Sequence, residues 1–349
     1  MSAAGLTIRR ATVTDDPAWD ALVLGAAEGT AFHRPHWLRA ACSRFGHQDR
    51  TLVAQDAAGS LVGVLPLVEF RGLGSGRAWI SVPYAVYGGA VATTAEAVEA
   101  LHQTAARVAQ QERIGRLELR CRRDPGLDWE AGVLHEGFSR DLPADPAAVL
   151  GSMPKKARAD ARRARRDLGL ELEEGRWYLP DLVRLFQRNK QALGTPALPY
   201  GWFEDLALAD LDRTHLHVVR RGHEVLAAVL SFSYQGELHA YYSGTAEGAD
   251  RSYKASSFLY CALQEWAIER GFTRFDFGRS RIGSGAHDFK RRQGFEPEPL
   301  GYRTLLVRDR SLPSLNPSNP RTAWAQRVWR GLPRDLAVPL GGYLSRFLP

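Results

Sequence analysis

The stretch LHVVRRGHEVLAAVLSFSYQGELHAYYS, from Leu216 to Ser243, decides the fold because it predicts β-strands joined by a tight turn. Leu216 to Val219 and Val225 to Tyr234 are rich in β-branched and apolar residues, and the turn Arg221 to Glu224 contains Gly222. Glu237 to Ser243 is predicted to form the next strand. This part of the chain therefore predicts a hairpin followed by a third strand.

The same order of elements occurs twice. After the three strands of the second half, a helix is expected from Ser256 to Arg270, closed by Gly271, and then a strand from Arg274 to Gly278. The first half has strands at Thr51 to Ala54, Leu61 to Phe70 and Trp79 to Val82, a helix from Ala95 to Glu112 and a strand from Leu117 to Cys121. Gly59 and Gly222 lie 163 residues apart, and Gly115 and Gly271 lie 156 apart. These similar offsets predict a duplicated α+β domain.

Composition excludes several classes of protein. The 349 residues are 44% hydrophobic and 24% charged, which fits neither a disordered nor a fibrous chain. No apolar run approaches the ~18 residues of a membrane-spanning helix, and Met1 to Gly5 lacks the pattern of a signal peptide, so a cytoplasmic protein is expected. Cys42, Cys121 and Cys261 form no C-x-x-C pair, which argues against a disulfide framework or a cysteine zinc site.

Positive charge is concentrated in one segment. The net charge is +7, and KKARADARRARR from Lys155 to Arg166 carries +6 of it. An alanine stripe ending at Leu168 predicts a helix over 155–168 that presents its cations outward. The candidate polyanion-binding residues are Lys155, Lys156, Arg158, Arg162 and Arg165. The alternative is an ordinary solvated helix, balanced by the acidic stretch that contains Glu171, Glu173 and Glu174.

The C-terminal tail differs from the rest of the chain. A turn-rich connector, Asn316 to Pro320, precedes Trp324, Tyr343 and other apolar residues set among arginines. This mixture suits an amphipathic helix in peripheral contact with a membrane surface, at the inner face. The alternative is that the tail packs across the protein, because Pro333 and Pro339 interrupt a long surface helix.

The segment from Phe275 to Phe295 is the richest in chemistry. Gly283 and Gly285 follow a strand, and such glycines let backbone N–H groups approach an anion. Arg279 and Arg281 supply charge there. Lys290 is one of only five lysines and is expected to lie exposed in a cleft; the alternative is an ordinary surface lysine. Asp276 and Asp288 are candidate bases that the sequence alone cannot pair with a partner.

A second candidate region lies in the first half. Tyr84, Tyr87, Gly88 and Gly89 follow a predicted strand and combine hydroxyl groups with bare backbone. Arg34 and Trp37, in the stretch FHRPHWL, are candidates for orienting a substrate. The alternatives are that the tyrosines pack at a tight bend and that Pro35 begins a helix.

The motif G-x-G-x-x-x-F-K at Gly283, Gly285, Phe289 and Lys290, with the Tyr87-Gly88-Gly89 loop and the basic helix, resembles the Fem family of peptidoglycan-bridge aminoacyltransferases. Within that family, the chain is most similar to FemAB-like proteins associated with PEP-CTERM exosortase systems. The resemblance implies two tandem GNAT-like (acyl-CoA N-acyltransferase-like) domains, each a mixed sheet flanked by helices. We expect them at 1–150 and 151–308, with a connector and tail at 309–349.

The resemblance also implies a function. A Fem-like enzyme transfers an acyl or aminoacyl group to an amine of a cell-envelope precursor, either of the peptidoglycan type or an exopolysaccharide. The donor is aminoacyl-tRNA or acyl-CoA, with no bound cofactor and no metal. Lys290, beside Phe289, would bind phosphate and steady charge at the transfer centre.

Departures from the GNAT pattern bear on the donor. The pyrophosphate signature Q/R-x-x-G-x-G/A would fall at 251–256, where Lys254 replaces the central glycine, which argues against the usual mode of CoA binding. Arg251 and Lys254 would still neutralise phosphate. Two alternatives stay open: a CoA-dependent N-acetyltransferase acting on an amino sugar, and a non-catalytic protein that binds nucleic acid or an anionic membrane.

Overall fold

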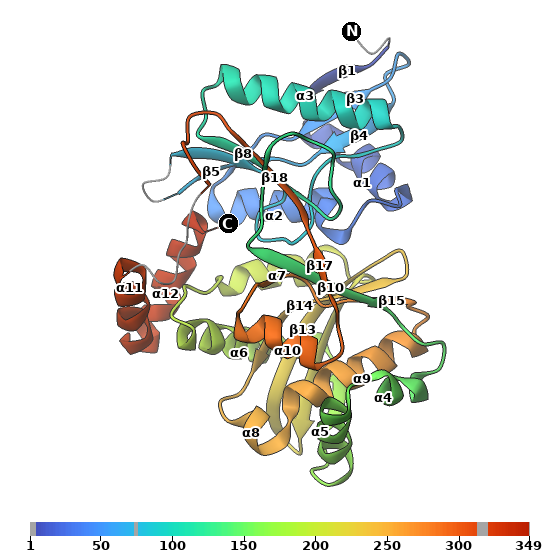
Figure 1. Cartoon of the computed structure of the whole chain (residues 1–349), viewed down its shortest axis with the longest axis vertical. Helices are drawn as coiled ribbons and strands as arrows, with labels where there is room; N and C mark the ends of the chain where they lie inside the picture. Colours follow the sequence, from blue (N-terminus) through green and yellow to red (C-terminus); the bar gives the residue numbers. More distant parts are fainter. Residues whose placement is uncertain (1–4, 73–75, 313–319, 349) are drawn as a thin grey trace. The chain divides into compact units, whose positions relative to one another are not determined.

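The computed structural model of the chain describes residues 5–72, 76–312 and 320–348 (Figure 1). The chain forms two units: Met1–Val133, Pro299–Leu315 and Arg346–Pro349 make up unit 1, and Leu134–Glu298 and Asn316–Ser345 make up unit 2. The chain thus changes unit near residues 133 and 298, where the sequence analysis placed boundaries at 150 and 308. Strand pairing is the cause, because β10 (His135–Asp141) pairs within unit 2 and β18 (Gly301–Leu306) pairs within unit 1.

Among its described residues, unit 1 contains one antiparallel sheet, one mixed sheet and three α-helices. One sheet has the order β1-β3-β4-β7 and the other β2-β5-β6-β8-β18-β9. The strands not yet given are β1 (Thr7–Arg10), β2 (Gln48–Asp49), β3 (Leu52–Gln55), β4 (Leu61–Leu65), β5 (Val68–Arg71), β6 (Arg77–Ile80), β7 (Val91–Ala92), β8 (Arg116–Cys121) and β9 (Glu130–Ala131). The helices are α1 (Asp16–Gly25), α2 (Pro35–Phe45) and α3 (Ala95–Gln111), and α3 packs on β3, β4 and β8.

One predicted strand of unit 1 is two strands. The expected strand from Leu61 to Phe70 is interrupted after Leu65, and its two parts, β4 and β5, lie in different sheets. Pro66 stands at the break, and proline has no backbone N–H to donate to a sheet.

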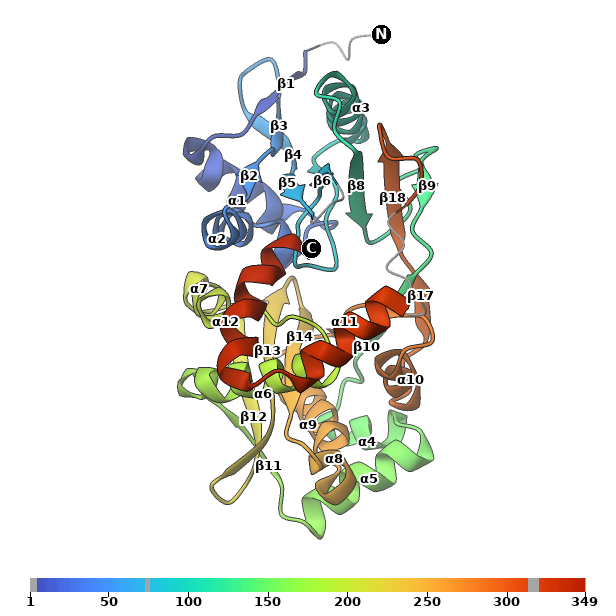
Figure 2. The same ribbon diagram turned by 90° about the vertical axis from the view of Figure 1, so that its left-hand side faces the viewer.

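Unit 2 is built on one large sheet, with the strand order β11-β12-β13-β14-β15-β10-β16 and β17 beside β10. The strands are β11 (Glu171–Glu174), β12 (Thr214–Arg221), β13 (Glu224–Tyr234), β14 (Glu237–Thr245), β15 (Arg274–Asp276), β16 (Ser280–Arg281) and β17 (Pro297–Pro299). The helices are α4 (Val149–Ser152), α5 (Lys155–Arg166), α6 (Leu179–Ala192), α7 (Tyr200–Ala209), α8 (Ala249–Tyr253), α9 (Ala255–Glu269), α10 (Gly285–Arg292), α11 (Pro320–Gly331) and α12 (Arg334–Leu344). Helix α9 packs on β12, β13 and β14, and α5 packs on α9 (Figure 2).

The predicted repeat is present in both units. In each unit, antiparallel strands lead through a helix to a strand that pairs in parallel: β6 with β8 after α3, and β14 with β15 after α9. The chain therefore has the α+β architecture that the sequence predicts, with a mixed sheet flanked by helices in each unit.

Helix α5 confirms the predicted narrow apolar stripe. Ala157, Ala161 and Ala164 are buried, and Gly169 takes a left-handed conformation (φ +64°) just beyond the helix end. No helix among the described residues is long and apolar enough to cross a membrane.

The tail forms two helices separated at Pro333. Pro339 lies inside α12 without ending it, so the prediction that this proline breaks the helix is wrong. The predicted connector from Asn316 to Pro320 lies outside the described residues except for Pro320, where α11 begins.

Candidate functional site

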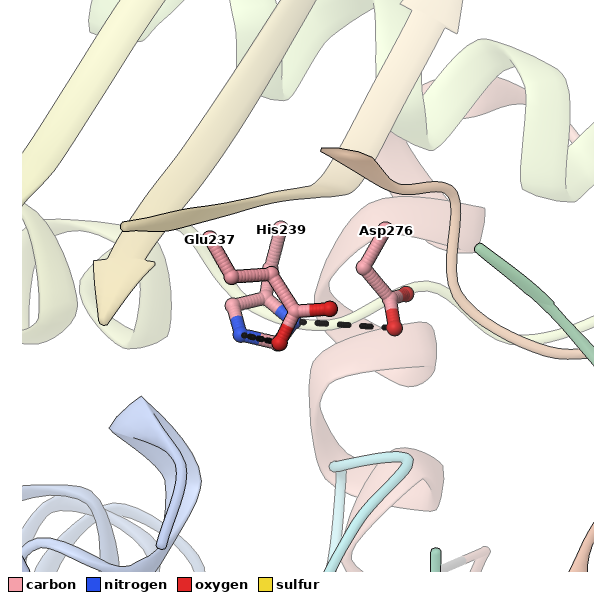
Figure 3. A group of neighbouring side chains, drawn as sticks. All are labelled: Glu237, His239 and Asp276. Atoms are coloured by element: carbon pink, nitrogen blue, oxygen red, sulfur yellow. Dashed lines mark ion pairs between the residues drawn. The ribbon is translucent and has the colours of Figure 1, made fainter. Parts of the chain in front are cut away.

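The short parallel contact between β14 and β15 brings three polar side chains together. Its register pairs Glu237 with Arg274, Leu238 with Phe275, and His239 with Asp276. Leu238 and Phe275 belong to the core that packs around α9. Since alternate residues of a strand point to opposite faces, Glu237, His239 and Asp276 project from the other face (Figure 3).

These three residues form a buried row, with exposed fractions of 7%, 1% and 1%. His239 Nε2 lies 3.4 Å from Glu237 Oε2, and His239 Nδ1 lies 3.9 Å from Asp276 Oδ2. Figure 3 shows an ion-pair contact from the imidazole ring to each of the two carboxylates. The distance to Asp276 is too long for a hydrogen bond, so the row is a buried group of two carboxylates and an imidazole in ion-pair contact.

The same row bears on metal binding. One ligand atom from each residue lies within 4.8 Å of the others, close enough for a metal ion. A metal ion here would be bound by one ring nitrogen of His239 and one oxygen from each carboxylate, while the shortest contacts of Glu237 and Asp276 are to different ring nitrogens. The row is therefore a candidate metal-binding group whose donor atoms are buried and close together.

Both ends of the row carry further partners. The Arg274 Nε atom lies 3.3 Å from Glu237 Oε1. The Gly278 backbone N–H donates to Asp276 Oδ1 at 2.6 Å. Arg274 and the Gly278 N–H thereby fix the two carboxylates that His239 contacts.

Lys290 is buried, so the prediction of an exposed lysine in a cleft is wrong. The residue is 8% exposed, and its Nζ donates to the carbonyl oxygens of Gly278 at 3.1 Å and Arg279 at 3.0 Å. The rings of Phe138 and Phe277 lie 5.3 and 5.2 Å from this nitrogen. Lys290 therefore fixes the turn that follows β15.

Burial lowers the pKa of Lys290 to about 7, with the Asp276 carboxylate opposing this shift and Arg279 adding to it. A neutral amine with both N–H groups donating to carbonyls keeps its lone pair available. Lys290 can therefore accept a proton near neutral pH, which an ordinary lysine cannot do.

Sequence reasoning missed Lys190 of α6. Burial lowers its pKa, and the nearby charge of Arg279 lowers it further. Its Nζ also lies 5.4 Å from the Phe186 ring centroid. Arg279 thus lies close enough to depress the pKa of both Lys190 and Lys290, and such mutual repulsion favours binding of an anion. The rarity of lysine in the chain was the available signal.

The glycine-punctuated loop has more regular structure than expected. Ser280 and Arg281 form β16, which pairs with β10. Gly283 has φ +74°, and Gly285 begins α10, whose N-terminus is capped by Ser284 Oγ accepting from the His287 N–H at 3.2 Å. One backbone N–H at the start of α10, that of His287, therefore already donates to a side chain of the protein.

Phe289 is half-buried and packs against the α9 core. Its ring lies 6.0 Å from Tyr260 and 6.2 Å from Phe277. The Phe289-Lys290 pair thus joins α10 to the strand that carries Asp276.

The expected pyrophosphate segment is partly helical. Arg251 lies in α8, and Lys254 adopts φ +59° between α8 and α9, with its Nζ donating to the Arg251 carbonyl at 3.2 Å. Asp250 accepts hydrogen bonds from Ser256 N at 2.8 Å and Ser256 Oγ at 2.9 Å. A carboxylate of the protein therefore already sits at the α9 N-terminus, the place where a helix dipole attracts phosphate.

The predicted substrate-binding aromatic residues of unit 1 are buried. Trp37 is 0% exposed and donates through Nε1 to the Pro83 carbonyl at 3.2 Å. Tyr84 is 8% exposed, with its hydroxyl 2.7 Å from His47 Nε2, and Tyr87 is 2% exposed. Trp37 and Tyr87 both pack against Phe32. Their placement corresponds to the packing alternative.

Arg34, Gly88 and Gly89 are likewise engaged within unit 1. Arg34 forms a two-pronged ion pair with Asp20, with both contacts at 2.8 Å. An added Cβ at Gly88 would lie 2.8 Å from Ser81 Oγ, and one at Gly89 (φ +103°) would lie 2.7 Å from Cys121 Sγ. Close packing therefore requires both glycines.

Helix α5 presents its cations to solvent. Lys155, Lys156, Arg162, Arg163 and Arg166 are exposed and Arg158 is half-buried. These six form no ion pair with any residue that the structure describes. Arg165 differs, because it pairs with Glu265 and lies over the Phe258 ring.

The acidic stretch does not balance α5. Glu173 pairs with Arg220 at 2.7 Å, and Glu174 lies 3.4 Å from Arg270. Glu171 also lies nearest to Arg220, at 3.9 Å. The alternative of a helix neutralised by these glutamates is therefore wrong.

Comparison with protein-family models assigns part of this site. Residues 153–291 match the family described as "Acetyltransferase (GNAT) domain". This matched part of the chain carries α5, the buried row and Lys290. A search of curated protein sequences gave no match.

Solved structures share the fold over most of the chain. FemX has 14% identity and a TM-score of 0.63 over 86% of this chain and 98% of its own. L-PGS from Bacillus licheniformis has 14% identity and a TM-score of 0.53, over 85% and 98%. A tandem GNAT protein from the clavulanic acid biosynthesis pathway has 15% identity and a TM-score of 0.51, over 88% and 99%. At these identities the likeness shows the fold alone.

Proposed function

We propose that this protein transfers an acyl or aminoacyl group to an amine of a cell-envelope precursor, of the peptidoglycan or exopolysaccharide type. The observation that carries the proposal is Lys290, whose pKa near 7 and fixed position after β15 suit proton transfer. The charges of Asp276 and Arg279 act on the pKa of Lys290 in opposite directions. The match of residues 153–291 to the GNAT domain supports the same class of reaction.

In the proposed step the amine nitrogen attacks the carbonyl carbon of the donor ester, and the bond from that carbon to the leaving oxygen breaks. Neutral Lys290 takes the proton that the amine loses and returns it to the leaving oxygen. Lys190 and Arg279 bind the phosphate of the donor or precursor. Asp276, at one end of the row, favours the protonated form of Lys290.

Two observations favour aminoacyl-tRNA over acyl-CoA as the donor. Asp250 occupies the α9 N-terminus, so a pyrophosphate there would meet a carboxylate. The unpaired cations of α5 suit a polyanion much longer than CoA. The finer assignment, to the Fem-like proteins of PEP-CTERM exosortase systems, stays a prediction from the G-x-G-x-x-x-F-K motif.

The test is binding and transfer with an aminoacyl-tRNA mixture and with acetyl-CoA across a salt series. Replacing Lys155, Lys156, Arg162 and Arg163 by glutamine should weaken tRNA binding at least ~10-fold and flatten its salt dependence. The matched control replaces Arg107 and Arg310, two exposed arginines of unit 1. Saturable acetyl-CoA turnover that ignores the α5 change would instead favour the N-acetyltransferase acting on an amino sugar.

A non-catalytic polyanion-binding protein is the second candidate, and the exposed cations of α5 favour it. It predicts salt-steep tRNA binding with no turnover from either donor. In that case there would be no acyl transfer whose rate could depend on the protonation of Lys290.

A further inference from the structure

Helix α12 has its apolar side chains in an inverted arrangement. It buries small residues: Ala337 is 5% exposed, and a Cβ added at the buried Gly341 would lie 3.1 Å from the Ala197 backbone nitrogen. Its large apolar residues, Leu336, Leu340 and Tyr343, are 53%, 44% and 58% exposed. Spacings of four and three residues put these three on one face. A helix on the surface of a protein normally turns its large apolar residues towards the core.

Helix α11 also exposes large apolar side chains, although its small residues Ala323 and Ala325 are exposed as well. Trp324 is 66% exposed and Val328 is 44% exposed, and the two are four residues apart. Trp329 is half-buried instead and lines a small cavity with Gln191 and Thr195. The two helices belong to unit 2 (Figure 2), and their large apolar side chains named above are more than two-fifths exposed.

The surrounding charge is positive. The described side chains of α11 and α12 include Arg327, Arg330 and Arg334 against one acid, Asp335. Arg334 lies near Arg184 and Arg188 of α6, and burial together with these two charges lowers the pKa of Arg334. Arg184 pairs with Asp181 at 2.6 Å, but Arg188 and Arg334 form no ion pair within residues 5–72, 76–312 and 320–348.

A groove between α6 and α12 adds an apolar recess to this cationic group. Its volume is about 440 Å³, and Pro180, Val183, Tyr200 and Val338 are among its lining residues. Arg184 and Arg334 also line it. Arginines beside an apolar recess match an amphiphile that carries a phosphate and a hydrocarbon chain.

We propose that the docking face formed by Trp324, Val328, Leu336, Leu340 and Tyr343 binds the surface of an anionic phospholipid bilayer. The apolar side chains enter the headgroup boundary, while Arg188 and Arg334 receive lipid phosphates. Exposed Trp, Tyr and Leu beside arginines are the composition of interfacial helices, and a protein partner would not require the cationic border. The protein then lies on the membrane, and this property is independent of the acyl transfer.

The test is sedimentation of the purified full chain with vesicles. Wild-type protein should bind vesicles containing phosphatidylglycerol at least ~10-fold more tightly than vesicles of phosphatidylcholine alone. Replacing Leu336, Leu340 and Tyr343 by serine should abolish binding to both. Arg188→Gln with Arg334→Gln should remove the preference for the anionic vesicles.

The matched control replaces Val13, Val133 and Leu208 by serine, which are exposed apolar residues outside the docking face. Its binding should equal that of the wild type. Equal thermal unfolding midpoints would show that each variant is folded. Absence of vesicle binding by wild-type protein, or a dimer in solution that the α12 variant dissociates, would overturn the proposal.

Discussion

Lys290 of α10 reaches across to the carbonyl oxygen of Gly278, 3.1 Å away, at the end of the strand that carries Asp276. This contact ties the position of a buried amine to the end of the β14–β15 pair, and it makes the behaviour of Lys290 sensitive to the charge on Asp276. Activity and stability should therefore both respond to changes at Lys290 and Asp276.

Lys290→Met should lower transfer by at least ~10²-fold, because the methionine has a similar length but accepts no proton. Lys290→Arg should not restore activity, since a guanidinium stays protonated. The measurement is kcat/KM against pH, which for the wild type should rise through about pH 7. Full activity in Lys290→Met would remove this residue from the reaction.

Lys290 should also make the free energy of unfolding depend on pH. The pKa of Lys290 is about 7 in the folded chain against 10.5 unfolded, so between these values the unfolded chain binds the extra proton. The free energy of unfolding therefore rises with pH in this window. From about pH 7 to about pH 9, wild type should gain about 2 kcal/mol relative to Lys290→Met in urea unfolding. A pH-independent difference would contradict the lowered pKa.

Asp276→Asn should shift the rising limb of the pH profile to lower pH. The Asp276 carboxylate raises the pKa of Lys290, and an amide removes that charge while its oxygen still accepts from the Gly278 N–H. The profile of kcat/KM against pH separates this effect from simple loss of activity. Asp288→Asn, an exposed change on α10, is the control. A shift equal to that of Asp288→Asn would show that Asp276 does not act on Lys290.

Glu69 anchors a buried charge cluster in unit 1. It is 2% exposed, and contacts with Arg50 and Arg77, at 2.7 and 2.8 Å, bring its pKa to about 2 although burial opposes this. A carboxylate with a lowered pKa stabilises the fold above its unfolded value of 4.5, and this contribution is lost as the pH falls towards 2.

Glu69→Gln should therefore destabilise the protein by about 2 kcal/mol near neutral pH, because the half-buried Arg50 and Arg77 lose their charged hydrogen bonds to Glu69 and keep only Glu112 as a carboxylate partner. The cost should shrink as the pH falls below about 4.5. Chemical unfolding at two pH values tests both statements, and a cost that does not change with pH would refute the pairing.

Much of the fold followed from local pattern. The hairpin around Gly222 and the helix of alanines and cations at 155–166 were predictable because strand alternation and helical spacing are properties of neighbouring residues. The break at Pro66 was also readable in principle, since proline lacks the N–H that a continuous strand needs.

The candidate site was only partly predictable. Phe289, Lys290 and Arg279 stood out in the sequence, but the expected exposure of Lys290 was wrong because burial depends on Phe138 and Phe277, which belong to other strands or loops. Tyr87 and Trp37 were predicted to bind substrate, and their burial was not visible in the sequence.

The sequence by itself determined the repeated order of strands and helices, the basic helix and the motif that ends in Lys290. Only the tertiary structure decided that His239 lies opposite Asp276, because the register of two parallel strands is set by the helix that joins them and the core beneath it. It also decided that α12 buries Ala337 and exposes Leu340, since close packing on Ala197 leaves room only for small side chains.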